Sequence, residues 1–109
     1  MAVLCRLEAP QLADAFARRA LQQIPASARA HELLGSALFL QEKREEGIAE
    51  LEEAVRLDPR SPSACFHLGL AYAGAQREAA ARAPLEPALA LDPGYEDARV
   101  LLERLKAGR

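Results

Sequence analysis

The chain has 109 residues, of which half are apolar and 28% are charged, and its formal net charge is -2. This composition is typical of one soluble domain or a piece of one, and it excludes an intrinsically disordered chain. Acidic and basic residues are interspersed, so no electrostatic feature favours nucleic acid or a membrane surface as a partner.

Targeting signals are absent from the sequence as it stands. The N-terminus, MAVLCRLEAP, has one arginine and few apolar residues, too few for a signal peptide. No apolar run approaches the roughly 20 residues that a membrane-spanning helix needs. Both observations favour a cytoplasmic location without a membrane partner, although a chain cut from a longer parent would lose an export signal with the removed part.

Two cysteines, Cys5 and Cys65, are the candidates for thiol chemistry. They form no C-x-x-C motif and no histidines cluster near them, so we interpret both as small buried hydrophobic residues in a reducing compartment. The sequence contains no G-x-S-x-G, no phosphate-binding glycine loop and no H-E-x-x-H. It therefore predicts no catalytic residue, no metal and no cofactor.

A constant period organises the chain. Pro25, Pro59 and Pro93 are each 34 residues apart, and the pair Leu34-Gly35 recurs at the same step as Leu68-Gly69. Small and apolar residues keep this phase throughout. A period of this length is typical of a stacked array of one helical unit.

The chain begins inside a first unit. Residues 1–8 are apolar on one side, and Leu4 falls where the later units carry Leu38 and Tyr72, so we predict the second half of a helix whose beginning is missing. Pro10 suits the opening position of a second helix, predicted over residues 11–23. Pro25 ends that helix, because the residue before a proline avoids the α region.

The next unit is complete. Ser27 is a good N-cap for a helix over residues 28–41, whose apolar residues cover more than one face. After a turn at residues 42–44, a second helix is predicted over residues 45–57. Gly47 lies inside it, where glycine costs about 1 kcal/mol relative to alanine, so we predict close approach of a neighbouring backbone. The glutamates are predicted to face solvent, with an i, i+4 pair between Glu52 and Arg56.

The following unit repeats this plan. Ser61 caps and Pro62 opens a helix over residues 62–75, and a second helix over residues 77–91 contains Pro84 and Pro87. An interior proline costs about 3 kcal/mol, so we predict a bend near residues 81–84 with both prolines on the outer, solvated side. A last helix over residues 96–106 has one apolar and one charged face, which is typical of a capping helix.

These residues resemble the tetratricopeptide repeat, a helix–turn–helix unit of 34 residues. Matches to the family pattern are Leu34, Gly35, Ala54 and Pro59 in one unit, and Leu68, Gly69, Tyr72, Ala81, Leu85, Ala88 and Pro93 in the next. His31 and Cys65 stand where the family has a tryptophan. The resemblance divides the chain into a partial first repeat (residues 1–25), two repeats (28–61 and 62–95) and a C-terminal capping helix (96–107).

The resemblance implies an all-α fold, a right-handed α-solenoid of antiparallel helix pairs with about five to six helices. The first helix of each pair is then expected to line a concave groove that binds a peptide or a helix of another protein. Family positions that face this groove fall on Arg29, Glu32, Leu33, Ser36, Phe39, Leu40, Ser63, Phe66, His67, Leu70, Ala73, Asp97, Val100, Leu101 and Arg104.

The groove is predicted to be apolar and to suit an amphipathic helix. A subset of the family grips the C-terminal carboxylate of chaperone tails with lysine, asparagine and arginine. Here Glu32 and Ser36 replace the first lysine and the asparagine, so we predict that this clamp is absent. The alternative for the apolar stripe is packing, within the chain or under a neighbouring repeat. His67 is predicted to form hydrogen bonds in the groove rather than to bind metal, and His31 to be half-buried.

The leading hypothesis for function is a non-enzymatic adaptor or scaffold that holds a peptide or helix of another protein, a conclusion that rests partly on analogy of fold. The first alternative is a structural array that self-associates through its ends, with Leu4, Leu12 and Phe16 at one end and the last helix at the other, giving homodimers or filaments. The second alternative is an accessory domain of a larger enzyme or assembly factor.

Overall fold

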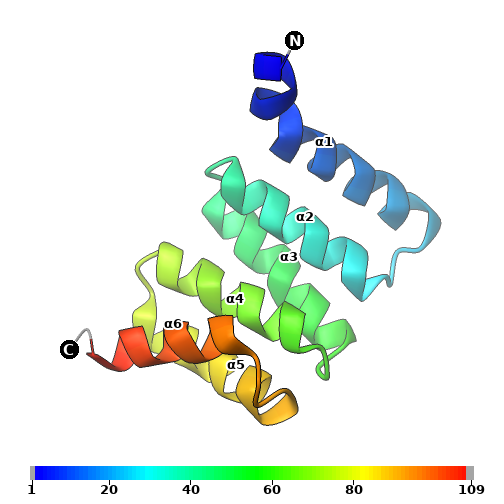
Figure 1. Cartoon of the computed structure of the whole chain (residues 1–109). Coiled ribbons are helices and arrows are strands. Elements are labelled where there is room, and N and C mark those ends of the chain that lie inside the picture. Colours follow the sequence, from blue (N-terminus) through cyan, green and yellow to red (C-terminus); the bar gives the residue numbers. More distant parts are fainter. Residues whose placement is uncertain (1, 108–109) are drawn as a thin grey trace.

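The computed structural model describes the backbone of residues 2–107 and the side chains of residues 9–107. The interpretations of Leu4 and Cys5 concern side chains outside that range. Within it the chain forms six α-helices and no strand, so the all-α prediction is confirmed (Figure 1). In chain order the helices are α1 (Ala2–Gln23), α2 (Ala28–Leu40), α3 (Arg44–Leu57), α4 (Pro62–Gly74), α5 (Glu78–Leu91) and α6 (Glu96–Ala107).

Serine caps set the starts of α2 and α4, as the sequence predicts. The hydroxyl oxygen of Ser27 accepts a hydrogen bond from the backbone N–H of Ala30 at 3.1 Å, and Ser61 accepts one from Ala64 at 3.2 Å. Pro62 is the first residue of α4. An N–H at this position would have no intrahelical acceptor, so the absence of one in proline costs no hydrogen bond. Equivalent helices of the two units therefore begin in the same way.

The turns inside the two helix pairs are copies of each other. Glu42 has a φ of 68° and Gln76 a φ of 66°, at the same position of each unit. A single left-handed residue of this kind ends a helix and reverses the chain. Because α2 packs against α3 and α4 against α5 across such short turns, each pair is antiparallel.

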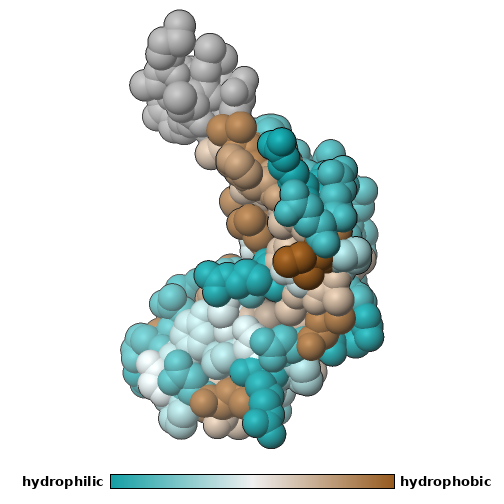
Figure 2. All heavy atoms as spheres, turned by 90° about the vertical axis from the view of Figure 1, so that its right-hand side faces the viewer, coloured by the Kyte–Doolittle hydropathy of each residue, from teal (hydrophilic) through white to brown (hydrophobic). Residues whose placement is uncertain are grey.

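The helix pairs stack as a curved α-solenoid with two layers. On the inner side, α2 contacts α4 and α4 contacts α6. On the outer side, no Cα atom of α1, α3 or α5 lies within 8 Å of a Cα atom of another of these three helices, within the described residues. Helices that meet on one side and splay apart on the other give a curved stack, and Figure 2 shows the inner side as an indentation at the left of the view.

Glycines lie where α2 and α3 cross. A Cβ added to Gly47 would lie 2.8 Å from the backbone oxygen of Gly35, and one added to Gly35 would lie 2.9 Å from the oxygen of Gly47. Only glycine permits an approach this close. The prediction for Gly47 is confirmed, and the space around the crossing is filled by fully buried leucines, among them Leu51.

The prediction for the N-terminal segment is wrong. Instead of two helices separated at Pro10, α1 runs without a break from Ala2 to Gln23 with Pro10 inside it. A proline removes one intrahelical hydrogen bond, and the alanine-rich sequence around it favours helix strongly. Beyond the proline, α1 packs against α2 through Ala17 and Leu21, which holds this part of the helix in place.

The prediction for the prolines of α5 is half wrong. Pro87 is exposed as predicted, but Pro84 is buried, and α5 runs without a break from Glu78 to Leu91. Positions 81, 84, 85 and 88 share one stripe of a helix. Ala81, Leu85 and Ala88 are fully buried in the core, so the same stripe carries Pro84 inward.

The predicted ion pair of α3 is also wrong in its partner. Arg56 bonds to Glu53, with Nε 2.9 Å from Oε1, rather than to Glu52. Glu52 instead accepts a hydrogen bond from the hydroxyl of Tyr72 on α4. Burial and this bond raise the pKa of Tyr72 to about 12, so the phenol remains a donor at neutral pH and ties α3 to α4.

Candidate functional site

A hollow of about 210 Å³ lies on the inner side, between α2 and α4. Its walls are mostly apolar, and its residues are Ser36, Phe39, Leu40, Leu51, His67, Leu70 and Ala71. Five of the predicted groove residues, Ser36, Phe39, Leu40, His67 and Leu70, therefore come together around one depression. We call this the inner hollow.

Apolar side chains at the inner hollow remain open to solvent. Leu40 is 70% exposed and Leu70 is 43% exposed. Leu33 on α2 and Val100 on α6 are exposed as well. For these four residues, packing within the chain does not explain the apolar character.

Some of the predicted groove residues pack against the core, and Phe39 does so while it also lines the inner hollow. Phe66, Ala73 and Leu101 are partly buried and pack against the core between α4, α5 and α6, while Phe39 packs against the core between α3 and α4. The Phe39 ring also lies against Gly74, where a Cβ would come within 2.4 Å of it. The core therefore holds the rings of Phe39 and Phe66 in place, and of the two only Phe39 lines the inner hollow.

Tyr95 contacts the predicted groove residue Phe66, and the sequence did not suggest this contact. It lies in the loop before α6, and its ring centre is 5.2 Å from that of Phe66. On the other side, Phe66 makes an edge-on contact with His67 at 5.3 Å. Because Tyr95 lies outside the helices, no helical periodicity points to it.

A polar network crosses from α2 to α4 at one edge of the hollow. Nδ1 of His67 is 2.9 Å from Oε2 of Glu32 and 2.8 Å from the backbone oxygen of Ser63, and the Ser63 hydroxyl donates to the same carboxylate. Both neighbours of Nδ1 are acceptors, so this nitrogen carries the proton. His67 thus forms hydrogen bonds at the groove.

The pKa values of Glu32 and His67 move apart. Burial alone would raise the pKa of Glu32, but hydrogen bonds from His67 and Ser63 outweigh burial and hold this pKa below its ordinary value. The hydrogen bond to Glu32 raises the pKa of His67 in spite of burial. Each partner therefore favours the charged form of the other.

This pair is expected to stabilise the fold most between pH 4.5 and 6.5. The contribution of His67 is fully present below its unfolded pKa of 6.5 and is lost as the pH rises through its higher folded value. That of Glu32 is present above its unfolded pKa of 4.5 and is lost as the pH falls through its lower folded value. Urea unfolding of the protein and of His67→Gln checks this.

The difference in unfolding free energy between the two proteins should be largest near about pH 5.5 and shrink by up to about 1 kcal/mol near about pH 8.5, since the pair is partly exposed. A difference that stays constant, or that grows with pH, would contradict the assignment. Glu53→Gln serves as the control, because its partner Arg56 does not titrate in this range.

The remaining predicted residues lie away from the inner hollow. Arg29 at the start of α2, Asp97 at the start of α6 and Arg104 near its end are exposed. Among the residues that the structure describes, no three His, Cys, Asp or Glu side chains gather as metal ligands would. None of the described helices is long and apolar enough to cross a bilayer.

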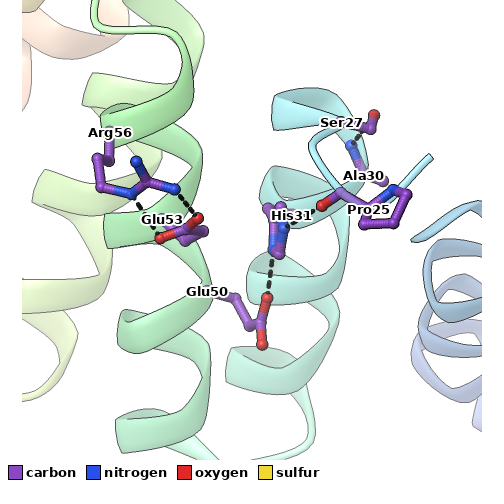
Figure 3. Close-up of polar contacts among 7 residues, drawn as sticks. All are labelled: Pro25, Ser27, Ala30, His31, Glu50, Glu53 and Arg56. Atoms are coloured by element: carbon purple, nitrogen blue, oxygen red, sulfur yellow. Dashed lines mark hydrogen bonds and ion pairs between the residues drawn. The ribbon is translucent and has the colours of Figure 1, made fainter. Parts of the chain in front are cut away.

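His31 is half-buried, as predicted, in the first complete unit, residues 28–61. Figure 3 shows its ring between Pro25 and Glu50. Nδ1 lies 2.7 Å from Oε1 of Glu50, and Nε2 lies 3.2 Å from the backbone oxygen of Pro25. The imidazole therefore joins α2 to α3 and to the loop before α2.

Comparison with known proteins gives one family and one fold. Residues 35–76 match a family model described as TPR repeat. The crystal structure of MamA is similar to this chain with a TM-score of 0.83 at 25% identity, over 91% of this chain and 58% of MamA. The chain thus spans little more than half the length of that relative. No curated protein sequence matches it.

Two further solved structures share the fold at lower identity. The Arabidopsis OM64 TPR domain has a TM-score of 0.87 at 20% identity, with 99% of this chain and 89% of that domain covered. The first TPR of Spaghetti (RPAP3), solved bound to an HSP90 peptide, has a TM-score of 0.87 at 19% identity, with 94% and 82% covered. At these identities the likeness concerns the arrangement of the helices.

Proposed function

Because the chain is a tetratricopeptide repeat protein, we propose that it is a non-enzymatic adaptor or scaffold that binds an amphipathic helix or peptide of another protein on its inner side. The division into a partial repeat (residues 1–25), two repeats (28–61 and 62–95) and a capping helix (96–107) belongs to this proposal, as does a cytoplasmic location. The observation that carries it is the inner hollow, where Leu40 and Leu70 are exposed beside the Phe39 ring that the core holds in place.

The hollow suits an apolar anchor rather than a charged one. Its lining is largely hydrocarbon, and a helix that docks into such a groove inserts side chains spaced three and four residues apart. A small set of anchors in a dry pocket supplies most of the affinity in interfaces of this kind. Exposed charged residues of the inner helices outside the hollow, Arg29 and Arg104, then orient the partner.

The acidic peptide tails bound by similar domains are not the proposed ligand. Glu32 stands near the hollow as a carboxylate, already bonded to His67 and Ser63. It would repel the C-terminal carboxylate of such a tail. The net charge of -2 likewise offers no basis for binding nucleic acid. An accessory role in a larger enzyme or assembly factor would use the same groove and is tested in the same way.

The test compares two leucines of equal exposure. Leu70 at the inner hollow is 43% exposed, and Leu91 at the end of α5, away from the hollow, is 42% exposed. A library of displayed helical peptides is selected against the protein, and the affinity of a selected peptide is measured by fluorescence anisotropy. Leu70→Glu should weaken binding by about 30-fold or more, since a charge at a central anchor site costs about 2 kcal/mol or more.

Leu91→Glu should change the affinity by less than about twofold, because surface substitutions away from a binding site have small effects. Circular dichroism confirms that both variants fold. Equal losses for the two variants, or unchanged binding of Leu70→Glu, would argue against the inner side as the binding face.

A further inference from the structure

The inner hollow has an apolar body and two polar lining groups. Ser36 on α2 and His67 on α4 are polar, and the other five residues of the lining are apolar. A ligand that fills the hollow must therefore be mostly hydrocarbon, yet it also meets a hydroxyl group and an imidazole. Covering either group without giving it a hydrogen-bond partner costs free energy. These two side chains therefore define the polar atom that a well-matched ligand carries.

The atom that His67 offers to a ligand is Nε2. Its Nδ1 is already in use, because it lies 2.9 Å from a carboxylate oxygen of Glu32 and 2.8 Å from the backbone oxygen of Ser63. Nε2 forms no hydrogen bond with the described residues. Among the side-chain nitrogens and oxygens that the structure describes, none is both buried and unbonded. Nε2 of the half-buried His67 is therefore open to solvent before a ligand arrives.

The other histidine of the chain has no such opening. Nδ1 of His31 lies 2.7 Å from Oε1 of Glu50, and Nε2 lies 3.2 Å from the backbone oxygen of Pro25 (Figure 3). Both ring nitrogens of His31 thus have partners within the chain, and His31 does not line the inner hollow. Of the two imidazoles, only that of His67 keeps a ring nitrogen for an outside partner.

A hydroxyl group suits Nε2 of His67 better than an ionic group does. In the neutral ring Nδ1 carries the proton and Nε2 accepts a hydrogen bond, whereas in the charged ring Nε2 donates one. A hydroxyl group both donates and accepts, so it can bond to either form. An ammonium group suits only the neutral ring and a carboxylate only the charged ring. A carboxylate would also be repelled by Glu32, which already lies beside the imidazole.

The size and lining of the hollow favour an aromatic body for this hydroxyl group. The hollow measures about 210 Å³, and a cavity of about 150 Å³ is large enough for a benzene molecule. The Phe39 ring, held in place by the core, forms part of the wall and can stack with a second ring. Serine, threonine, asparagine and glutamine bring a polar group on a much smaller apolar body. Tyrosine is the side chain that joins an aromatic ring to a hydroxyl group.

We propose that the inner hollow is a tyrosine site, in which the ring of a partner's tyrosine lies against Phe39 and Leu70 and its hydroxyl group bonds to Nε2 of His67. This inference rests on the proposed function, because it names the anchor of the same partner. The Ser36 hydroxyl can bond to the remaining side of the phenol oxygen. Glu32 acts through His67, since it determines which ring nitrogen faces the ligand.

The first test needs no peptide. p-Cresol has the side chain of tyrosine and toluene has that of phenylalanine, and each is titrated into the isotope-labelled protein. p-Cresol is expected to shift the backbone amides of Ser36, His67 and Leu70, and to bind about fivefold or more tightly than toluene, the effect of about one net hydrogen bond. No shift at these amides, or equal affinity for the two compounds, would overturn the tyrosine site without any variant.

Two matched variants assign the preference to Nε2. His67→Asn removes Nε2 but keeps an N–H close to the place of Nδ1, so Glu32 retains a donor. The preference for p-cresol over toluene should then fall to less than about twofold. His31→Asn makes the same exchange away from the hollow and should leave the preference unchanged. Circular dichroism confirms that both variants fold. A preference that survives His67→Asn would overturn the assignment.

The second test uses helical peptides selected against the protein, and retains those whose binding Leu70→Glu weakens. In such a peptide, exchange of one tyrosine for phenylalanine should lower the affinity about tenfold for the unmodified protein and less than about threefold for His67→Asn. Inner-side peptides that bind without tyrosine, or lose nothing on this exchange, would overturn the tyrosine site and leave the proposed function intact. Peptides that are all indifferent to Leu70→Glu would count against the proposed function, and the p-cresol titration then decides the tyrosine site by itself.

Discussion

Replacing Gly47 with alanine is expected to lower the free energy of unfolding by about 2 kcal/mol, although alanine favours helix by about 1 kcal/mol. The new methyl group would meet the backbone oxygen of Gly35 at 2.8 Å and the backbone nitrogen of Phe39 at 3.1 Å. Neither atom can rotate away, so α2 and α3 must move apart. The equivalent position of the second unit is Ala81, which shows that a wider pair is possible and limits the cost.

The measurement is equilibrium unfolding in urea with Gly94→Ala as the control. A Cβ at Gly94 would find its nearest neighbour, a carboxylate oxygen of Asp92, at an ordinary distance of 3.7 Å. Gly94→Ala should therefore change stability by less than about 0.5 kcal/mol. Because Phe39 belongs to the inner hollow, Gly47→Ala should also weaken peptide binding. A stabilised Gly47→Ala variant would show that the crossing is looser than described.

Replacing Leu85 with alanine is expected to cost about 3 kcal/mol of stability, the largest effect foreseen for a single substitution. Leu85 is fully buried between α4, α5 and α6. Its side chain lies against Gly69, where an added Cβ would meet Cγ at 2.7 Å and Cδ2 at 2.9 Å. The glycine makes room for the leucine, and the leucine fills the space that the glycine leaves.

The two positions should therefore be coupled. Gly69→Ala alone is expected to destabilise the protein, because the methyl group collides with Leu85. In the Leu85→Ala background the same methyl group would occupy part of the cavity, so Gly69→Ala should be neutral or stabilising there. A double-mutant cycle measures the difference, for which about 1 kcal/mol or more is expected. Additive effects would show that the two residues do not share one packing site.

Periodicity made most of the fold predictable. In a repeated unit, the same residue type recurs at equivalent positions, so each prediction is made twice. Ser27 and Ser61 both predict a helix start, and Gly35 and Gly69 both predict a close helix crossing. The failures lie where a single residue departs from the period. Proline disfavours the interior of a helix, which is why Pro10 and Pro84 were predicted to start or bend one. Whether a proline interrupts a helix, or faces the protein core from within it, depends on packing against the neighbouring helices. The same holds for Glu52, whose partner Tyr72 lies on another helix.

The candidate sites were predictable to different degrees. The residues of the inner hollow were expected from the positions that face the groove in the repeat family. The sequence itself adds that the helix over residues 28–41 is apolar on two faces, and in the structure Leu34 and Leu38 are buried while Leu40 remains exposed. Tyr95 escaped prediction because a loop has no periodicity. A second hollow, lined by Cys65 of α4 and Pro84 of α5 among others, escaped it because it needs a short side chain on α4 and an apolar one on α5, and neither is unusual alone. Only the contact between His31 and Glu50 in the first unit shows what the second unit has lost.

The most direct test of the inner side as the binding face is an NMR titration of the labelled protein with a selected helical peptide. Binding on the inner side predicts that the backbone amides of Ser36, Leu40, His67 and Leu70 shift on titration, while those of Glu46 and Glu53 on the outer side stay in place. Shifts concentrated on α3 and α5, with the amides of α2 and α4 unmoved, would contradict it.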